Sequence, residues 1–124
     1  MTALSDVDWK IAFGHHHMYT GGVRKNEVTN WVRSSLESVF EKNKLDVYFC
    51  GHEHDLQHLK AQNKFTHHFV SGAGSEIRPT GVVNQTIFSA SVQGFMSVSV
   101  TRDNLTVKVI DYKGNVLHVT EIKK

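Results

Sequence analysis

Two short apolar runs, each followed by a glycine and then by histidine, constrain this chain more than any other feature. The first run ends at Phe13 and leads into Gly14-His15-His16-His17, and the second ends at Cys50 and leads into Gly51-His52-Glu53-His54. Between them, residues 26–42 repeat apolar side chains at helical spacing, which predicts an amphipathic helix. A strand, a helix and a strand in this order form a right-handed βαβ unit with parallel strands. The sequence therefore predicts an α/β core in which both strands end at the same edge.

Parallel strands would bring the histidines that follow them to one rim of the sheet. Open α/β sheets place their ligands at the carboxyl ends of strands, so we expect His15 and His52 to lie side by side. Neutral imidazole is a good ligand for zinc, iron, copper or nickel. The pattern His52-Glu53-His54 alone also occurs in surface or structural pairs, and a turn between its histidines would let them reach two adjacent metals. Both interpretations stay open, and the two groups together favour a metal site.

The remainder of the chain predicts strands and no further helix. Residues 56–62 and 65–71 predict a hairpin. Further strands are expected at 86–91, 95–101, 105–111 and 116–122. In the strand at 95–101, Met96, Val98 and Val100 alternate with polar residues, which predicts one buried and one solvated face. The fold class predicted from these patterns is a strand-rich α/β (α+β) fold with one main helix at about 26–42.

Composition argues against several classes of protein. The net charge of +2 over 124 residues is too small to indicate nucleic-acid binding. No apolar run approaches the roughly 18 residues of a membrane span. Cys50 is the single cysteine, so no internal disulfide can form, and we expect a buried, inert thiol. Nine histidines are the anomaly, and a non-catalytic histidine-rich module that binds metal is one hypothesis for function.

Three segments resemble the calcineurin-like metallophosphoesterase family, in particular its purple (tartrate-resistant) acid phosphatase branch. They are Gly14-His15 with residues 18–22, then Cys50 to Gln57, then Val70 to Gly74. That branch has Gly-His-(Tyr or His)-Pro, Cys-Gly-His-Asp-His-Asn-Leu-Gln and Ser-Gly-Ala-Gly in the same order. The resemblance covers essentially the whole chain. It implies the C-terminal half of a metallophosphatase β-sandwich flanked by helices, with residues 1–124 as a single partial domain.

The resemblance also implies metal ligands and a reaction. His15 and His52 would match ligands of the second metal, and His54 would match a ligand of the first, which is ferric iron in purple phosphatases. The parent protein would hold two metal ions, iron with iron, zinc or manganese, and its substrate would be a phosphate monoester. Paired metal ions promote such hydrolysis by activating water and by stabilising phosphate charge.

Departures from the family pattern limit this expectation. The first half of the family's domain supplies Asp-x-His, Gly-Asp and Gly-Asn-His motifs, and none of these occurs here, so all the carboxylate ligands are missing. We therefore expect the isolated chain to bind metal weakly or in part and to lack phosphatase activity. No residue is assigned a catalytic role. Arg24, His16 and His17 are candidate phosphate contacts, and polar residues on a loop rim are the simpler interpretation of the two histidines. A catalytically inactive phosphatase-fold scaffold is the alternative function.

The missing half has consequences for association and compartment. Apolar faces that it would cover are expected to drive formation of a homo-oligomer or association with the missing N-terminal half. Asn84 and Asn104 begin glycosylation sequons, which would matter in a secreted or lysosome-like parent.

Four other positions are expected to be structural. Trp31 is predicted to pack in the core. One of the adjacent pair His67 and His68 should face solvent and the other the core. His58 and His118 are predicted to lie on the surfaces of strands.

Overall fold

The computed structural model describes residues 7–26 and 29–124. Its helix is α1 (Thr29–Lys42), and its strands are β1 (Ile11–Phe13), β2 (Val47–Cys50), β3 (Leu56–Leu59), β4 (His67–Ser71), β5 (Thr86–Ala90), β6 (Gly94–Val100), β7 (Asn104–Asp111) and β8 (Val116–Lys123). Every predicted strand is confirmed, with ends shifted by a few residues. Within the described ranges, no helix has the length and apolar character needed to cross a membrane.

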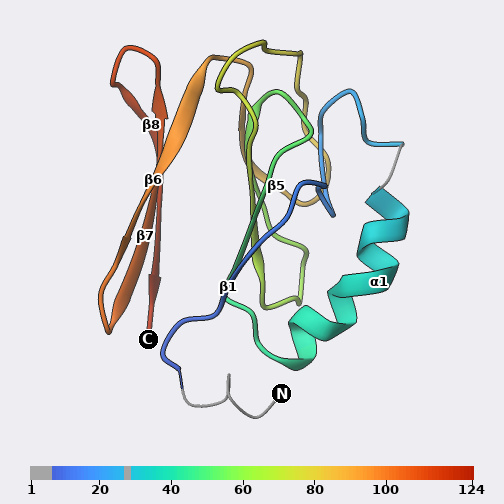
Figure 1. Ribbon diagram of the computed structural model, residues 1–124, viewed down its shortest axis with the longest axis vertical. Helices are drawn as coiled ribbons and strands as arrows, with labels where there is room; N and C mark the ends of the chain where they lie inside the picture. The colour runs from blue at the N-terminus through green and yellow to red at the C-terminus, as the bar shows by residue number, and fades with distance from the viewer. Residues whose placement is uncertain (1–6, 27–28) are drawn as a thin grey trace.

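A five-stranded sheet forms the centre of the structure, in the order β1-β2-β4-β3-β5. β1 pairs with β2 in parallel, with Phe13 opposite Phe49, and β2 pairs with β4 in parallel. β3 and β4 form the predicted antiparallel hairpin. Helix α1 connects β1 to β2 and covers one face of this sheet (Figure 1). The βαβ unit is therefore confirmed, and β1, β2 and β4 all end at the same edge.

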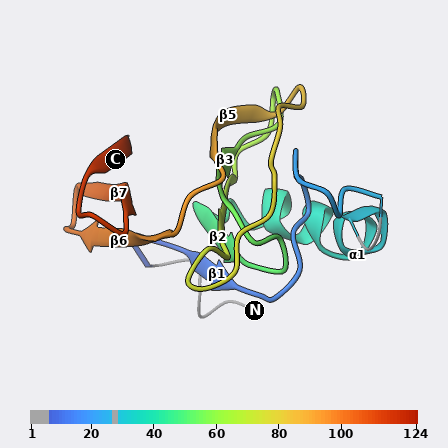
Figure 2. The same cartoon turned by 90° about the horizontal axis from the view of Figure 1, so that it is seen from above.

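The second sheet lies against the face opposite α1, which gives three layers (Figure 2). Its strands are antiparallel in the order β6-β7-β8. Alternation along β2 divides its side chains between the two interfaces. Val47 and Phe49 pack in a cluster with residues of β7, whereas Tyr48 and Cys50 pack in a cluster that contains Val32 of α1. Cys50 is buried, as expected, and burial raises the pKa of its thiol.

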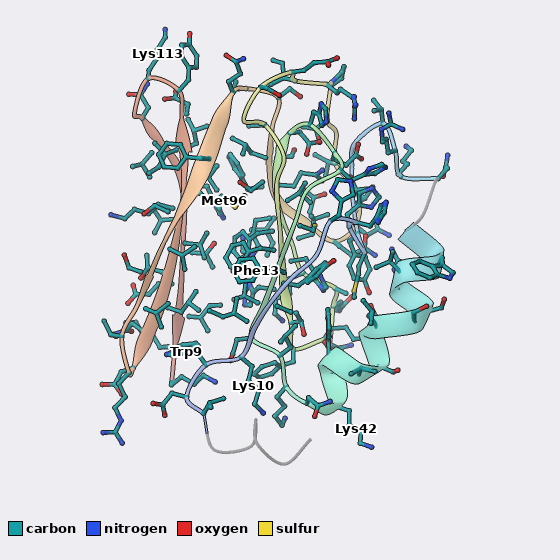
Figure 3. All side chains as sticks on the ribbon, viewed as in Figure 1. Trp9, Lys10, Phe13, Lys42, Met96 and Lys113 are labelled. Carbon is teal, nitrogen blue, oxygen red and sulfur yellow. The ribbon has the colours of Figure 1, made fainter. Side chains whose placement is uncertain are left out.

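An apolar groove lies between β1 and β6, which are edge strands of their sheets. It has a volume of about 340 Å³, and its lining includes Phe13, Phe49, Met96 and Val98. Figure 3 shows Phe13 and Met96 directed into the space between the sheets. Phe13 is 79% exposed, and Val98 and Val100 are 40% and 48% exposed. The predicted buried face of β6 is therefore only partly covered, because β6 has no neighbouring strand on this side among the described residues.

The helix differs from its prediction in two respects. It begins at Thr29, whereas Asn26 lies in a turn and residues 27–28 lie outside the described ranges. The prediction that Trp31 packs in the core is wrong, since this side chain is 69% exposed. Val32 and Phe40 make the apolar contacts of α1 with the sheet instead. Fewer apolar residues of α1 thus contact the sheet than the apolar stripe in its sequence predicts.

Three histidines form a row between the two sheets, and we call His58, His67 and His118 the inter-sheet histidines. His58 Nδ1 lies 3.0 Å from His118 Nε2, and His58 Nε2 lies 2.9 Å from His67 Nδ1. The prediction of a surface position is wrong for His58, which is 2% exposed, and His118 is half-buried. β3 is an interior strand of its sheet, and the second sheet covers the face that carries His58.

The adjacent pair on β4 also differs from its prediction. His68 is buried on the α1 side of the sheet, where its ring lies edge-on to Tyr19 and Tyr48. His67 lies beside His58 on the other face of the strand and is half-buried, so it is only partly exposed to solvent. Because β4 lies inside the sheet and elements pack on both of its faces, the middle of the strand is buried and only its ends reach water.

Candidate metal centre

The ends of β1 and β2 are tied together directly beyond their last residues. Gly14 donates a backbone hydrogen bond to Phe49 O at 3.0 Å, and Gly51 donates one to His15 O at 2.9 Å. Tyr48 Oη of β2 donates to His16 O at 2.7 Å, which fixes the start of the β1–α1 loop against β2. These bonds hold the two Gly-His segments at one rim of the sheet, as the sequence predicted.

His15, His16 and His52, which we call the rim histidines, converge at this point. His52 Nδ1 lies 3.3 Å from His15 Nε2, and one ligand atom from each of the three residues lies within 4.8 Å of the others. Their rings stack edge-on or tilted, with centroids 4.8–5.2 Å apart. Among the described residues, this is the one group of three or more potential metal-binding side chains of the His, Cys, Asp and Glu types.

The backbone at His52 is strained in a way that serves this convergence. Its φ is 67°, and Glu53 N donates to Gly51 O at 2.8 Å, so His52 is the central residue of the rare γ-turn with positive φ. A non-glycine residue in this region costs on the order of 1–3 kcal/mol and occurs mostly at functional sites. The turn reverses the chain immediately after β2 and directs the His52 ring to the β1–α1 loop.

The other predicted site residues are placed differently. His54 is outside the rim histidine group, and its Nδ1 is buried without a hydrogen-bond partner. His17 is fully buried, so the expectation of an exposed rim position is wrong for it, although its ring lies 5.7 Å from that of His52. Arg24 is half-buried, and its backbone N–H donates to Glu53. His16 lies in the β1–α1 loop, as expected, and is also a member of the convergent group.

Two buried carboxylates beneath the rim were missed in the sequence. Glu53 is 0% exposed and Asp55 is 1% exposed. Gln57 Nε2 donates to both oxygens of Asp55 at 2.9 Å. Burial raises the pKa of Asp55 to about 6, the negative charge of Glu53 adds to this, and the Gln57 hydrogen bond opposes it. Alternation was the available signal, because Glu53 and Asp55 occupy the positions between and after the two histidines of the motif.

Arg78 is a third residue that sequence reasoning missed. Its backbone N–H donates to His54 O at 2.9 Å, and its guanidinium Nη1 donates to His52 O at 3.2 Å. It therefore fixes the backbone of both histidines of the motif from a loop that follows β4. No local pattern around Arg78 indicates this role, which depends on the tertiary fold.

The residues at the rim fit a divalent transition metal ion. Imidazole nitrogens suit zinc, iron and similar ions, and nitrogens that ligate one ion lie on the order of 3 Å apart, since each bond is about 2 Å long. The His15–His52 separation of 3.3 Å meets this distance condition. Two of the rim histidines are half-buried and His15 is exposed, so the group is open to an ion from solvent.

Comparison with known proteins points to one family of phosphoesterases. The family model for the calcineurin-like phosphoesterases matches residues 3–56. Purple acid phosphatase 4 of Arabidopsis thaliana is 37% identical over 125 residues, which correspond to 97% of this chain and 36% of that protein. The chain therefore spans about a third of the length of the curated relatives that it matches.

Two solved structures share the fold. A purple acid phosphatase from yellow lupin (Lupinus luteus) seeds matches 98% of this chain and 27% of its own, with a TM-score of 0.83 and 21% identity. GAP50, the anchor in the inner membrane complex of Plasmodium, matches 98% of this chain and 38% of its own, with a TM-score of 0.87 and 18% identity. At these identities the two structures establish the fold, and the family is established by the sequence relatives. The chain belongs to the calcineurin-like phosphoesterases and is related over nearly its whole length to purple acid phosphatases.

Proposed function

We propose that this chain contributes the histidine side of a dinuclear metal site in a protein that hydrolyses phosphate monoesters. The observation that carries the proposal is the convergence of His15, His16 and His52 at the carboxyl ends of parallel strands. The relationship to purple acid phosphatases supports the reaction class.

In this proposal, the rim histidines hold one ion and His54 holds the second. The buried Nδ1 of His54 has no hydrogen-bond partner, which supports a bound ion beside this nitrogen. A bound metal pair, iron with iron, zinc or manganese, would act as a Lewis acid toward phosphate and lower the pKa of water. Arg24 is the candidate phosphate contact of this chain, since a guanidinium can bind phosphate through two N–H groups. His16, a candidate phosphate contact from the sequence, is assigned to the ion instead. We do not retain His17, because its ring is fully buried.

The oxygen ligands of the metal pair would come from sequence outside residues 1–124, which we treat as one part of a domain. Two observations support this view: the chain spans about a third of its relatives, and no carboxylate joins the rim histidines among the described residues. The apolar groove between β1 and β6 is the surface where the rest of the domain, or a second copy of the chain, would pack. The isolated chain is accordingly proposed to lack phosphatase activity.

A catalytically inactive scaffold is the second candidate. GAP50 shares the fold and is an anchor in the inner membrane complex of Plasmodium, so this fold also serves an anchoring role. A scaffold has no need of converging imidazoles or of a strained turn at His52, whereas a metal site needs both. A histidine-rich metal-binding module without catalysis is the third candidate function. Use of the sequons at Asn84 and Asn104 in a secreted or lysosome-like parent is a separate proposal about compartment.

The proposal is tested by titrating the chain with Zn²⁺ and following the heat of binding. We expect one ion to bind weakly, and His15→Gln or His52→Gln to abolish that binding. His118→Gln is the matched control, because it removes an imidazole that lies between the sheets, and it should leave binding unchanged. Equal loss in all three variants would contradict the proposed site. If the chain with excess iron, zinc or manganese hydrolysed p-nitrophenyl phosphate at enzyme-like rates, the proposal that its oxygen ligands lie outside residues 1–124 would be contradicted.

A further inference from the structure

We infer that Glu53 is a positioning residue that locks the β1–α1 loop onto the His52 turn and thereby sets the metal affinity of the rim histidines. The inference rests on the proposed function, because it concerns the same site. Glu53 is the residue between the two histidines of the motif, and its side chain is fully buried.

The carboxylate of Glu53 is held by residues that follow the rim histidines in the β1–α1 loop. Thr20 Oγ1 donates to Glu53 Oε2 at 2.6 Å. The backbone N–H of Arg24 lies 3.2 Å from both carboxylate oxygens. A Cβ on Gly22 would lie 2.2 Å from Oε2, so the loop can approach this closely only with glycine at that position. Hydrogen bonds to an ionised carboxylate are stronger than neutral ones, and burial increases the cost of losing them.

The backbone of Glu53 is fixed just as firmly on its other side. Its N–H closes the γ-turn on Gly51 O at 2.8 Å. A Cβ on Gly72 would lie 1.9 Å from Glu53 O, so the strand end after β4 packs directly against the turn. The backbone of Glu53 is thus part of the His52 turn, and its carboxylate is hydrogen-bonded to the loop that carries His15 and His16. Glu53 therefore couples the positions of all three rings.

Two other roles for Glu53 fit the contacts less well. Glu53 is not a member of the convergent ligand group, and both of its oxygens already accept hydrogen bonds from the loop. It is not simply a buried charge tolerated by the fold, since its partners come from one short segment that leads directly from the rim histidines. Metal ligands must be held to about 0.5 Å, which residues behind the ligands commonly provide.

The test compares Zn²⁺ affinity, measured by titration calorimetry, in two matched carboxylate variants of the 124-residue chain. Glu53→Gln replaces the acceptor beside Arg24 N with an amide that can present a donor there. Glu41→Gln is the control, because Glu41 also accepts two backbone N–H groups, from Phe65 at 2.7 Å and Thr66 at 3.2 Å, at the far end of α1. Circular dichroism establishes that each variant is folded at the temperature of the titration.

We expect Glu53→Gln to weaken Zn²⁺ binding by about 10- to 100-fold, the range typical of residues that support metal ligands, while Glu41→Gln leaves affinity unchanged even where it lowers the unfolding midpoint. Thr20→Val removes the hydroxyl that donates to Glu53, together with the hydrogen bonds that this hydroxyl accepts from Gly22 N and Gln57 Nε2. It should weaken binding in the same direction, and this single variant covers the case in which Glu53→Gln does not fold. Where both single variants fold, the double variant should lose less affinity than the sum of the two.

Wild-type affinity in folded Glu53→Gln, or in Thr20→Val should the first variant not fold, would overturn the inference and leave the proposed function standing. A wild-type chain that binds no Zn²⁺ would overturn the proposed function itself, and this inference with it. An equal loss of affinity in Glu41→Gln would assign the effect to general stability and would also overturn the positioning role.

Discussion

Acid should destabilise this protein through its buried histidines, and His58 allows the effect to be isolated. Burial, together with the nearby positive charges that His67, His118, His68 and Lys60 can carry, lowers the pKa of His58 from 6.5 to about 3. The folded pKa is thus below the unfolded value. The unfolded chain therefore binds more protons between these two values, and stability falls as pH drops below about 6.5 and levels off near pH 3.

The magnitude follows from the same two values. Between about pH 7.5 and about pH 5, the unfolded chain takes up nearly one proton at this position and the folded chain almost none, which corresponds to about 2 kcal/mol. Burial likewise lowers the pKa of His67 and His68 to about 4 each. The three together could reach about 6 kcal/mol, a ceiling because rings in contact do not titrate independently. Since small domains are stable by about 5–15 kcal/mol, the chain should approach unfolding near pH 5.

The measurement is urea unfolding followed by circular dichroism at both pH values. His58→Gln cannot titrate but keeps hydrogen-bonding groups between His67 and His118, so we expect its stability loss to be smaller than that of the wild type by about 2 kcal/mol. Thr120→Val is the control, because it removes a hydroxyl 3.0 Å from His58 Nδ1 without removing a titrating group. Its loss on acidification should equal that of the wild type. If His58→Gln lost as much stability on acidification as the wild type, His58 would not be kept neutral by the fold and the reasoning would fail.

Two further predictions concern close packing and the open groove. Gly72→Ala should lower the free energy of unfolding by roughly 1–3 kcal/mol, since the new Cβ would lie 1.9 Å from Glu53 O, whereas Gly74→Ala, with no atom within 4 Å, should be nearly neutral in the same urea titration. The chain should self-associate through its groove, so Phe13→Asp should shift light scattering toward the monomer. Val82→Asp, at an equally exposed position in a loop, should leave it unchanged, and a wild-type monomer at high concentration would contradict the prediction.

The βαβ unit and the meeting of His15 with His52 followed from sequence because each step depends on local pattern and chain handedness. Apolar runs locate the strands, helical spacing locates α1, and the right-handed crossover makes β1 and β2 parallel. The environment of His58 did not follow. Whether the second face of β3 is covered depends on where β8 packs, which is tertiary information. The prediction that Trp31 packs in the core failed for a related reason. Periodicity locates an apolar stripe on the helix, but it does not show which part of that stripe contacts the sheet.

The rim histidines and the inter-sheet histidines show how the same side chain serves opposite purposes. In the inter-sheet row, His58 uses each of its nitrogens on a different neighbour, so the lone pairs of the row do not converge on one point. At the rim, nitrogens from two loops converge beside open space. The groove between β1 and β6 is lined by Gly14 and Gly51, the residues directly before His15 and His52. A strand added in parallel to the edge of β1 that no described strand covers would therefore end at the same rim and bring its following loop to the rim histidines, where the proposed metal site lacks oxygen ligands.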